Sequence, residues 1–260
     1  SIWALEGAGM VWVGARQDRV FARHFGLLLQ LAAAIIFLDS VWYPFAPLPF
    51  ANRYFLGCLF LSIAAFVSSY YLDQYADRLK KWEKYYPLPL MIWGLAWWYL
   101  GGVQEIDRQL PVFRKAHGFL FFCSVTSMLV GLAARKLPWT RLSLALLLQL
   151  PIMIFLVPFS LAGFHNDSHL FVGWGVAVWP LAFVVQYRLL YLFARDWPNK
   201  PGLFWHIGTL WLLLFVASHE AAWAVGQVAG LSAVWSLVCW ALVPCGGLFV
   251  LLYLAEKTWW

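Results

Sequence analysis

The sequence predicts an all-α membrane protein, a polytopic helical bundle of about nine transmembrane helices. Hydrophobic residues make up 63% of the 260 residues, charged residues make up only 12%, and the mean hydropathy is +0.72. A soluble domain of this length does not need so much apolar surface, so lipid is the expected solvent. The apolar runs are continuous rather than alternating, which disfavours a transmembrane β-barrel.

Nine apolar stretches are candidates for these helices, because roughly 20 apolar residues cross the ~30 Å hydrocarbon layer. In chain order they cover residues 2–15, 25–39, 54–71, 88–103, 118–134, 142–161, 170–193, 203–228 and 233–254. The first stretch is short and the chain starts at Ser1 without an initiator Met, so we expect a fragment of a longer multi-pass protein. The amino end lacks the basic start and small-residue cleavage site of a signal peptide.

Basic residues between the stretches predict how the helices alternate across the membrane. If the first helix runs inward, 14 of the 18 Lys and Arg residues fall on the cytoplasmic side. The other four, on the outward side, are Arg53, Arg108, Arg114 and Lys115. This asymmetry follows the positive-inside rule, so the net charge of +6 needs no nucleic-acid partner to explain it. Membrane lipids are the expected partners.

The longest polar segment, 73–86, has the sequence DQYADRLKKWEKYY and lies on the predicted cytoplasmic side. Its Tyr75, Leu79 and Trp82 follow one another at spacings of four and three residues, which is typical of one helix face. We therefore predict a short amphipathic helix that rests in the lipid headgroups.

An internal repeat is indicated by the pentapeptide LLLQL, which occurs at 27–31 and again at 146–150. The landmarks at Arg16, Gln30 and Glu105 recur at Arg135, Gln149 and Glu220, at offsets of 119, 119 and 115 residues. Four helices in each copy give both copies the same orientation. We expect parallel repeats at 1–116 and 117–232 within a single transmembrane domain, 1–260, with an extra helix at 233–254.

Glu105 and Glu220 are the first candidates for a functional site, because they lie at the predicted outward ends of the fourth and eighth helices. Two carboxylates that face one outward cavity could bind a cation, relay protons, or act as acid and base. Alternatively, each carboxylate marks the point where its helix meets water. His219, Trp223 and Gln227 accompany Glu220 and form a polar-aromatic stripe that suits a sugar or a headgroup; helix packing is the other interpretation.

Glu6 is the candidate at membrane depth, roughly 15 Å from the interface by helical rise. Its neighbours Ala4 and Ala8 allow another helix to approach closely. A protonated, structural Glu6 that bonds Gln149 or Gln30 is one interpretation, and a functional carboxylate is the other. The second copy of the repeat has no acid at the matching place.

Metal and cofactor motifs are sparse in this sequence. His165, Asp167 and His169 have the H-x-D-x-H spacing of metal ligands, but three ligands without a fourth do not define a site, so we predict no metal. The four cysteines lie in apolar stretches without a CxxC pattern, which predicts buried thiols. A Walker loop, GxSxG, HExxH and a nucleotide fingerprint are all absent from the sequence, so we expect no cofactor and no soluble catalytic domain.

The amino end carries a resemblance to a known family. At 3–17, WALEGAGMVWVGARQ, followed by FGLLLQ at 25–30, the chain resembles the bacterial predicted membrane proteins grouped as domain of unknown function 2339. The resemblance implies a multi-pass protein of the bacterial inner membrane with a role in the cell envelope. It also implies a partner with a periplasmic domain, and it supplies no catalytic residues.

Three functions follow from these observations. The first is a transporter- or flippase-like protein that handles an envelope lipid or glycan through an outward-facing polar cavity. The second is a non-catalytic membrane scaffold of an envelope assembly. The third is an intramembrane transferase or hydrolase that uses Glu105 and Glu220. Convergence of polar side chains in one cavity would separate the first and third functions from the second.

Overall fold

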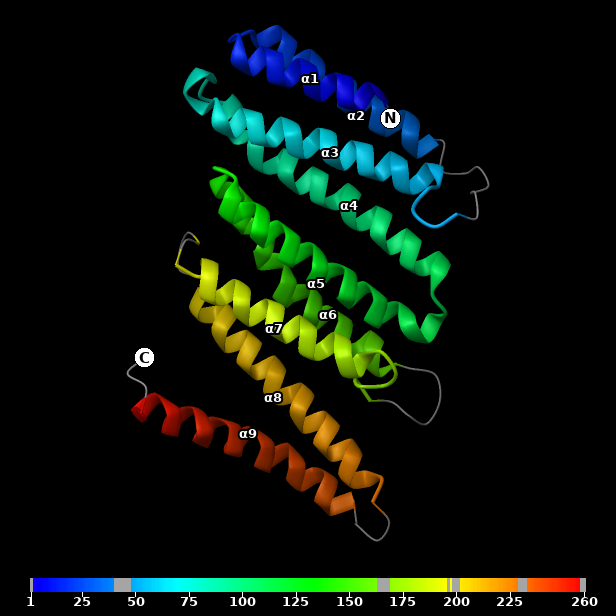
Figure 1. Cartoon of the computed structure of the whole chain (residues 1–260), viewed down its shortest axis with the longest axis vertical. Helices are drawn as coiled ribbons and strands as arrows, with labels where there is room; N and C mark the ends of the chain where they lie inside the picture. The colour runs from blue at the N-terminus through cyan, green and yellow to red at the C-terminus, as the bar shows by residue number, and fades with distance from the viewer. Residues whose placement is uncertain are drawn as a thin grey trace. The chain divides into compact units, whose positions relative to one another are not determined.

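The computed structural model describes residues 2–39, 48–162, 169–195, 197, 202–228 and 233–257, except for the side chains at 140, 233 and 254–257. The described residues are 86% helix and contain no β-strand. In chain order (Figure 1) the α-helices are α1 (Ile2–Arg16), α2 (Val20–Asp39), α3 (Arg53–Gln74), α4 (Pro87–Gln109), α5 (Val112–Lys136), α6 (Gln149–Leu161), α7 (Gly175–Phe193), α8 (Gly202–Gly226) and α9 (Ala233–Lys257).

These helices confirm the predicted all-helical membrane architecture. Within the described residues, seven helical segments are long and apolar enough to cross a membrane. They are α2, α3, α5, the segment Arg141–Leu161, α7, α8 and α9. Helices α1 and α4 also form where the sequence predicts them, but they are not among these seven. Nine membrane crossings therefore remain a prediction.

The stretch that precedes α6 is wound more tightly than an α-helix. Residues Thr140–Leu148 form a 3-10 helix that leads directly into α6. Pro151 has no N–H to donate to the carbonyl of Leu147, four residues earlier, as a continuous α-helix would require. The indole Nε1 of Trp205, in α8, donates to this carbonyl instead, at 3.0 Å. A side chain from another helix thus satisfies the carbonyl that Pro151 cannot.

The chain forms two compact units that are not contiguous in sequence. Unit 1 contains residues 1–112 and 130–145, and unit 2 contains residues 113–129 and 146–260. Unit 1 contains α1 to α4 and the carboxyl-terminal part of α5. Unit 2 contains the rest of α5 and α6 to α9.

Small residues bring the helices of unit 1 together. Ala4 and Ala8 of α1 are buried, as their spacing predicts. Gly7 of α1 faces Gly26 of α2 so closely that a Cβ on Gly7 would lie 2.5 Å from the carbonyl oxygen of Gly26. Without a strong hydrophobic force between helices in lipid, such backbone contact and its dispersion energy hold the pair together.

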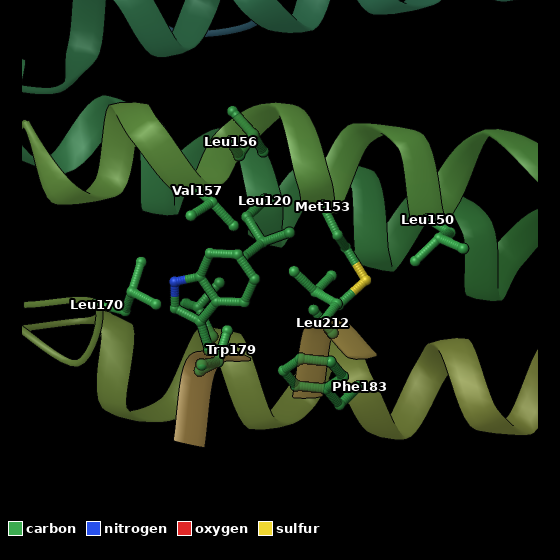
Figure 2. Packing of buried hydrophobic residues seen from close by; sticks show 12 residues of the cluster. Leu120, Leu150, Met153, Leu156, Val157, Leu170, Trp179, Phe183 and Leu212 are labelled. Carbon is green, nitrogen blue, oxygen red and sulfur yellow. The ribbon is translucent and has the colours of Figure 1, made fainter. Parts of the chain in front are cut away.

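The core of unit 2 is built around Trp179 of α7, which is fully buried (Figure 2). Its indole lies among Leu120 of α5 and Leu156 and Val157 of α6. Leu170, from the turn before α7, belongs to the same cluster. This packing fixes α7 against α5 and α6, and it holds the turn at 170 at the end of the unit.

The polar segment 73–86 differs from its prediction. It contains two 3-10 turns, Ala76–Arg78 and Glu83–Tyr85, rather than an amphipathic α-helix. Trp82 is exposed, but Leu79 and Glu83 are buried. A single helix would place Tyr75, Leu79 and Trp82 together on the membrane surface. The turns instead bury Leu79 and direct Glu83 inward to a partner on α2.

That partner is Arg23, and the two side chains form a buried, bidentate ion pair. Arg23 Nε donates to Glu83 Oε1 at 2.9 Å, and Nη2 donates to Oε2 at 2.8 Å. Arg23 Nη1 also donates to the carbonyl of Gly14 at 2.9 Å and to Asp18 at 3.3 Å. Each residue of the pair is only 1% exposed, so the pair joins α1, α2 and the 73–86 segment through satisfied charges.

Glu83 stays ionised in this setting. Burial acts to raise the pKa of Glu83, but hydrogen bonds from Arg23 and from the Lys80 N–H, together with the charge of Arg23, outweigh burial. The pKa of Glu83 is therefore held below the ordinary carboxyl value. A carboxylate with a lowered folded-state pKa contributes stability above its unfolded pKa and loses that contribution as the pH falls through the folded value.

We predict that Glu83→Gln lowers the free energy of unfolding by about 3–5 kcal/mol, because it leaves the charge of Arg23 buried and uncompensated. Asp18→Asn is the matched control: Asp18 contacts the same guanidinium but is 65% exposed, so a change of about 0–1 kcal/mol is expected. Thermal or denaturant unfolding in detergent measures both variants. The deficit of Glu83→Gln should be complete above the unfolded carboxyl pKa of about 4.3 and should shrink below it. Equal stability of the two variants near neutral pH would contradict the prediction.

Candidate functional site

Glu105 lies near the end of α4 in unit 1, where it anchors the segment that precedes α3. Its carboxylate accepts hydrogen bonds from the Phe50 N–H, at 3.0 Å, and from the side-chain amide of Asn52. Asn52 in turn caps α3 by accepting from the Phe55 N–H at 2.9 Å. Phe50 has a positive φ of 58°, which is uncommon for a bulky residue and directs its N–H to the carboxylate. Glu105 is only 2% exposed and does not simply meet water.

Glu220 has a similar position near the end of α8 in unit 2. Its carboxylate accepts from the Leu170 N–H at 2.6 Å and from His169 Nδ1 at 2.8 Å. A carboxylate oxygen can only accept here, so His169 carries its proton on Nδ1. The His169 ring is stacked on Trp223, with 3.6 Å between ring centroids. The carbonyl of Leu170 accepts from the buried His117 of α5 at 3.1 Å.

The two carboxylates share one local arrangement. In each unit, a carboxylate near the end of a helix accepts a backbone N–H and a side-chain N–H from the segment before another helix of that unit. Both oxygens of each carboxylate are used in this way. The direct effect of Glu105 and Glu220 is thus to fasten the segments at 48–52 and 169–170.

Only some of the predicted site residues come together. Within unit 2, Glu220 contacts His169, and His219 Nδ1 lies 3.7 Å from the carboxylate; Trp223 stacks on His169. Gln227 is exposed just beyond the end of α8. Glu105 belongs to unit 1. A single cavity that contains both carboxylates remains a prediction.

Glu6 and Gln149 have separate surroundings. The side chain of Glu6 is exposed on α1. Gln30 donates to Ser68 at 2.8 Å rather than pairing with Glu6. Gln149 is fully buried in unit 2, where it accepts from Ser127 at 2.9 Å and donates to Ser124 at 3.1 Å. Both glutamines thus satisfy their amides inside the bundle, as polar groups in lipid require.

Of the three residues with metal-ligand spacing, His165 and Asp167 lie outside the described residues, and His169 is the partner of Glu220. Across the described ranges, no three His, Cys, Asp or Glu side chains gather closely enough to hold a metal ion. Cys58 and Cys123 are buried free thiols, whereas Cys239 is half-buried and Cys245 is exposed.

A groove on unit 2, which we call the α7–α8 groove, was not predicted from the sequence. It has a volume of about 870 Å³ and is lined by Phe171, Pro180, Phe183, Val184, Tyr187, Arg188, Tyr191, Leu213, Val216, Ala217 and Glu220. The positions on α7 recur at spacings of three and four residues, so they follow one helix face. Arg188 could have marked this face in the sequence, because it lies inside an apolar run rather than in a loop.

We predict that Glu105→Gln loosens the 48–52 segment, because the amide NH2 group replaces one acceptor oxygen with a donor. An unsatisfied buried donor costs about 1–3 kcal/mol, so amide hydrogen exchange of a peptide covering 48–56 should become faster. Glu6→Gln is the control, since its exposed carboxylate fastens no segment of unit 1 that the structure describes. Unchanged exchange in Glu105→Gln would show that the carboxylate does not fasten the segment.

Comparison with known protein families identifies the chain. The family model of the predicted membrane proteins DUF2339 matches residues 1–260. No curated protein and no solved structure matches the chain. The match covers the whole sequence and agrees with the apolar helices and the amino-terminal motif, so the chain belongs to the DUF2339 family of predicted membrane proteins.

Proposed function

We propose that this protein is a transporter- or flippase-like membrane protein that handles an envelope lipid. The observation that carries the proposal is the α7–α8 groove on unit 2, which is largely apolar and has a charged residue toward each end. Its volume of about 870 Å³ is within the ~300–1,000 Å³ range of small-molecule sites. The groove offers hydrocarbon contact along its length and polar contact at Arg188 and Glu220.

The dimensions of the groove support a lipid rather than a glycan. Along α7 the lining extends about 16 Å by helical rise, from Pro180 to Tyr191, which is roughly half of the ~30 Å hydrocarbon layer. Val184 and Tyr191 are exposed on one face of α7, and Val216 of α8 is buried beneath. The hydrogen-bonding side chains of the lining, Tyr187, Arg188, Tyr191 and Glu220, lie toward its ends, and the stretch between them is apolar, which suits an acyl chain better than a sugar.

The matched arrangements at Glu105 and Glu220 support two parallel repeats, at 1–116 and 117–232. In a transporter-like protein, each carboxylate would fasten one outward segment over its own unit. Parallel repeats of this kind are a common architecture for carriers. We place the protein in the bacterial inner membrane, with a periplasmic-domain envelope protein as its partner on the outward side.

The proposed orientation can be tested by labelling introduced cysteines in intact cells. We predict that a cysteine at Lys81 reacts only with membrane-permeant reagents, because the basic 78–84 segment is cytoplasmic. A cysteine at Asp167 should react with impermeant reagents from outside. Labelling of both positions from the same side would contradict the orientation.

A membrane scaffold is the second candidate, and a specific observation favours it. The carboxylates of Glu83, Glu105 and Glu220 all accept hydrogen bonds that fasten the fold. A scaffold uses its buried charges in this way, whereas a carrier also needs a surface that binds cargo. The groove is therefore the feature on which the two functions differ.

We predict that Val184→Trp slows lipid movement several-fold by filling the groove. Val176→Trp is the matched control: both valines are on α7, they are 66% and 60% exposed, and only Val184 lines the groove. The measurement is transbilayer movement of a fluorescent phospholipid in vesicles that contain the protein. Absence of protein-dependent movement in the unsubstituted protein would favour the scaffold, and equal rates in the two variants would exclude the groove as the path.

A further inference from the structure

A second groove lies on unit 1, apart from the α7–α8 groove. It has a volume of about 460 Å³ and runs between α1, α2 and α3. Trp3, Ile36, Leu56 and Phe60 supply much of its apolar surface, and Arg53 supplies its charge. Arg53, Leu56 and Phe60 follow one another at spacings of three and four residues, so they share one face of α3. The groove extends about 10 Å from Arg53 to Phe60 by helical rise.

The floor of this groove is rigid. Gly57 lies opposite the Phe37 ring, and a side chain on Gly57 would collide with that ring. Phe37 also packs edge-on against the buried Trp97, with ring centroids 5.6 Å apart. The absence of a Cβ at Gly57 thus lets an aromatic ring of α2 lie against α3. The Phe37 ring therefore forms a fixed part of the groove floor, while exposed side chains form its rim.

Arg53, the charge at the mouth of the groove, forms no ion pair with another described residue. The carboxylate of Glu105, at the same end of unit 1, is engaged by the Phe50 N–H and Asn52 and lies 3.9 Å from Arg108. The segment 40–47 contains no Asp or Glu in its sequence. Arg53 is also the first residue of α3, where the positive end of the helix dipole adds to its charge.

We propose that this groove binds an anionic phospholipid, with the headgroup phosphate on Arg53 and an acyl chain against Leu56 and Phe60. A guanidinium pairs with phosphate through two parallel hydrogen bonds. A headgroup with net negative charge neutralises the mouth of the groove, whereas a zwitterionic headgroup brings its own cation and leaves it positive. Trp3, exposed beside the groove, belongs to a residue type that favours the membrane interface. The site is independent of lipid movement through the α7–α8 groove.

The test uses the protein in nanodiscs that contain either phosphatidylglycerol or phosphatidylcholine, each carrying a photoreactive acyl chain. We expect several-fold more adducts with phosphatidylglycerol on the peptides that contain Trp3, Leu56 and Phe60. Arg53→Gln should abolish this preference. Arg53→Lys should retain part of it, because Lys keeps the positive charge but cannot form the two parallel hydrogen bonds of a guanidinium. Arg188→Gln, in the α7–α8 groove, should leave these adducts unchanged.

A second variant separates lipid binding from a general effect on folding. Leu56→Trp fills the groove but keeps Arg53, so it should reduce adducts with both lipids at these peptides. Size-exclusion profiles and melting temperatures identify any variant that has not folded. Equal labelling by the two lipids in the unsubstituted protein, or full phosphatidylglycerol preference in folded Arg53→Gln, would overturn the proposal. Loss of labelling on addition of inorganic phosphate alone would also overturn it, because the groove would then add nothing to binding.

Discussion

The structure depends on the high cost of an unsatisfied charge or polar group in lipid. Hydrocarbon offers no hydrogen bonds, so a charged or strongly polar group inside the bundle is costly without a protein partner. The charges of Arg23 and Glu83 are satisfied by their ion pair. The carboxylates of Glu105 and Glu220 are satisfied by hydrogen bonds from the N–H groups of nearby segments. The same requirement accounts for Gln149, whose amide is satisfied by two serines. These contacts determine which segments are fixed to which helices.

Buried charges hold different connecting segments in the two units. In unit 1, the ion pair of Arg23 and Glu83 joins the 73–86 segment to α1 and α2, while Glu105 fastens the segment before α3. In unit 2, Glu220 fastens the turn at 170, whose leucine also packs on Trp179. Charges therefore hold the connections, whereas small and apolar side chains hold the helices.

Much of the helical structure could be predicted from the sequence, because membrane hydropathy is a local property. The stretches from 2–15 to 233–254 all correspond to helical segments, and the small residues at Ala4 and Ala8 are buried as predicted. Glu105 and Glu220 could be identified from the sequence as carboxylates at the ends of predicted membrane helices, but the groups that they bind could not. Asn52 and His169 reach them only through the folding of loops, and His169 was considered only as a weak candidate for metal binding. Glu83 was missed because it stands among other charges, 60 residues from Arg23.

The hydrogen bond from Trp205 to the Leu147 carbonyl has a consequence for motion within unit 2. If α8 slid along the start of α6, this carbonyl would lose its donor in a hydrocarbon environment, at a cost of several kcal/mol. Helix α8 is therefore the fixed wall of the α7–α8 groove. Helix α7 carries Pro180 within its length and so lacks one of its own backbone hydrogen bonds. Because Trp179 holds the start of α7 in the core, we expect any widening of the groove to come from bending of the rest of α7 at this proline.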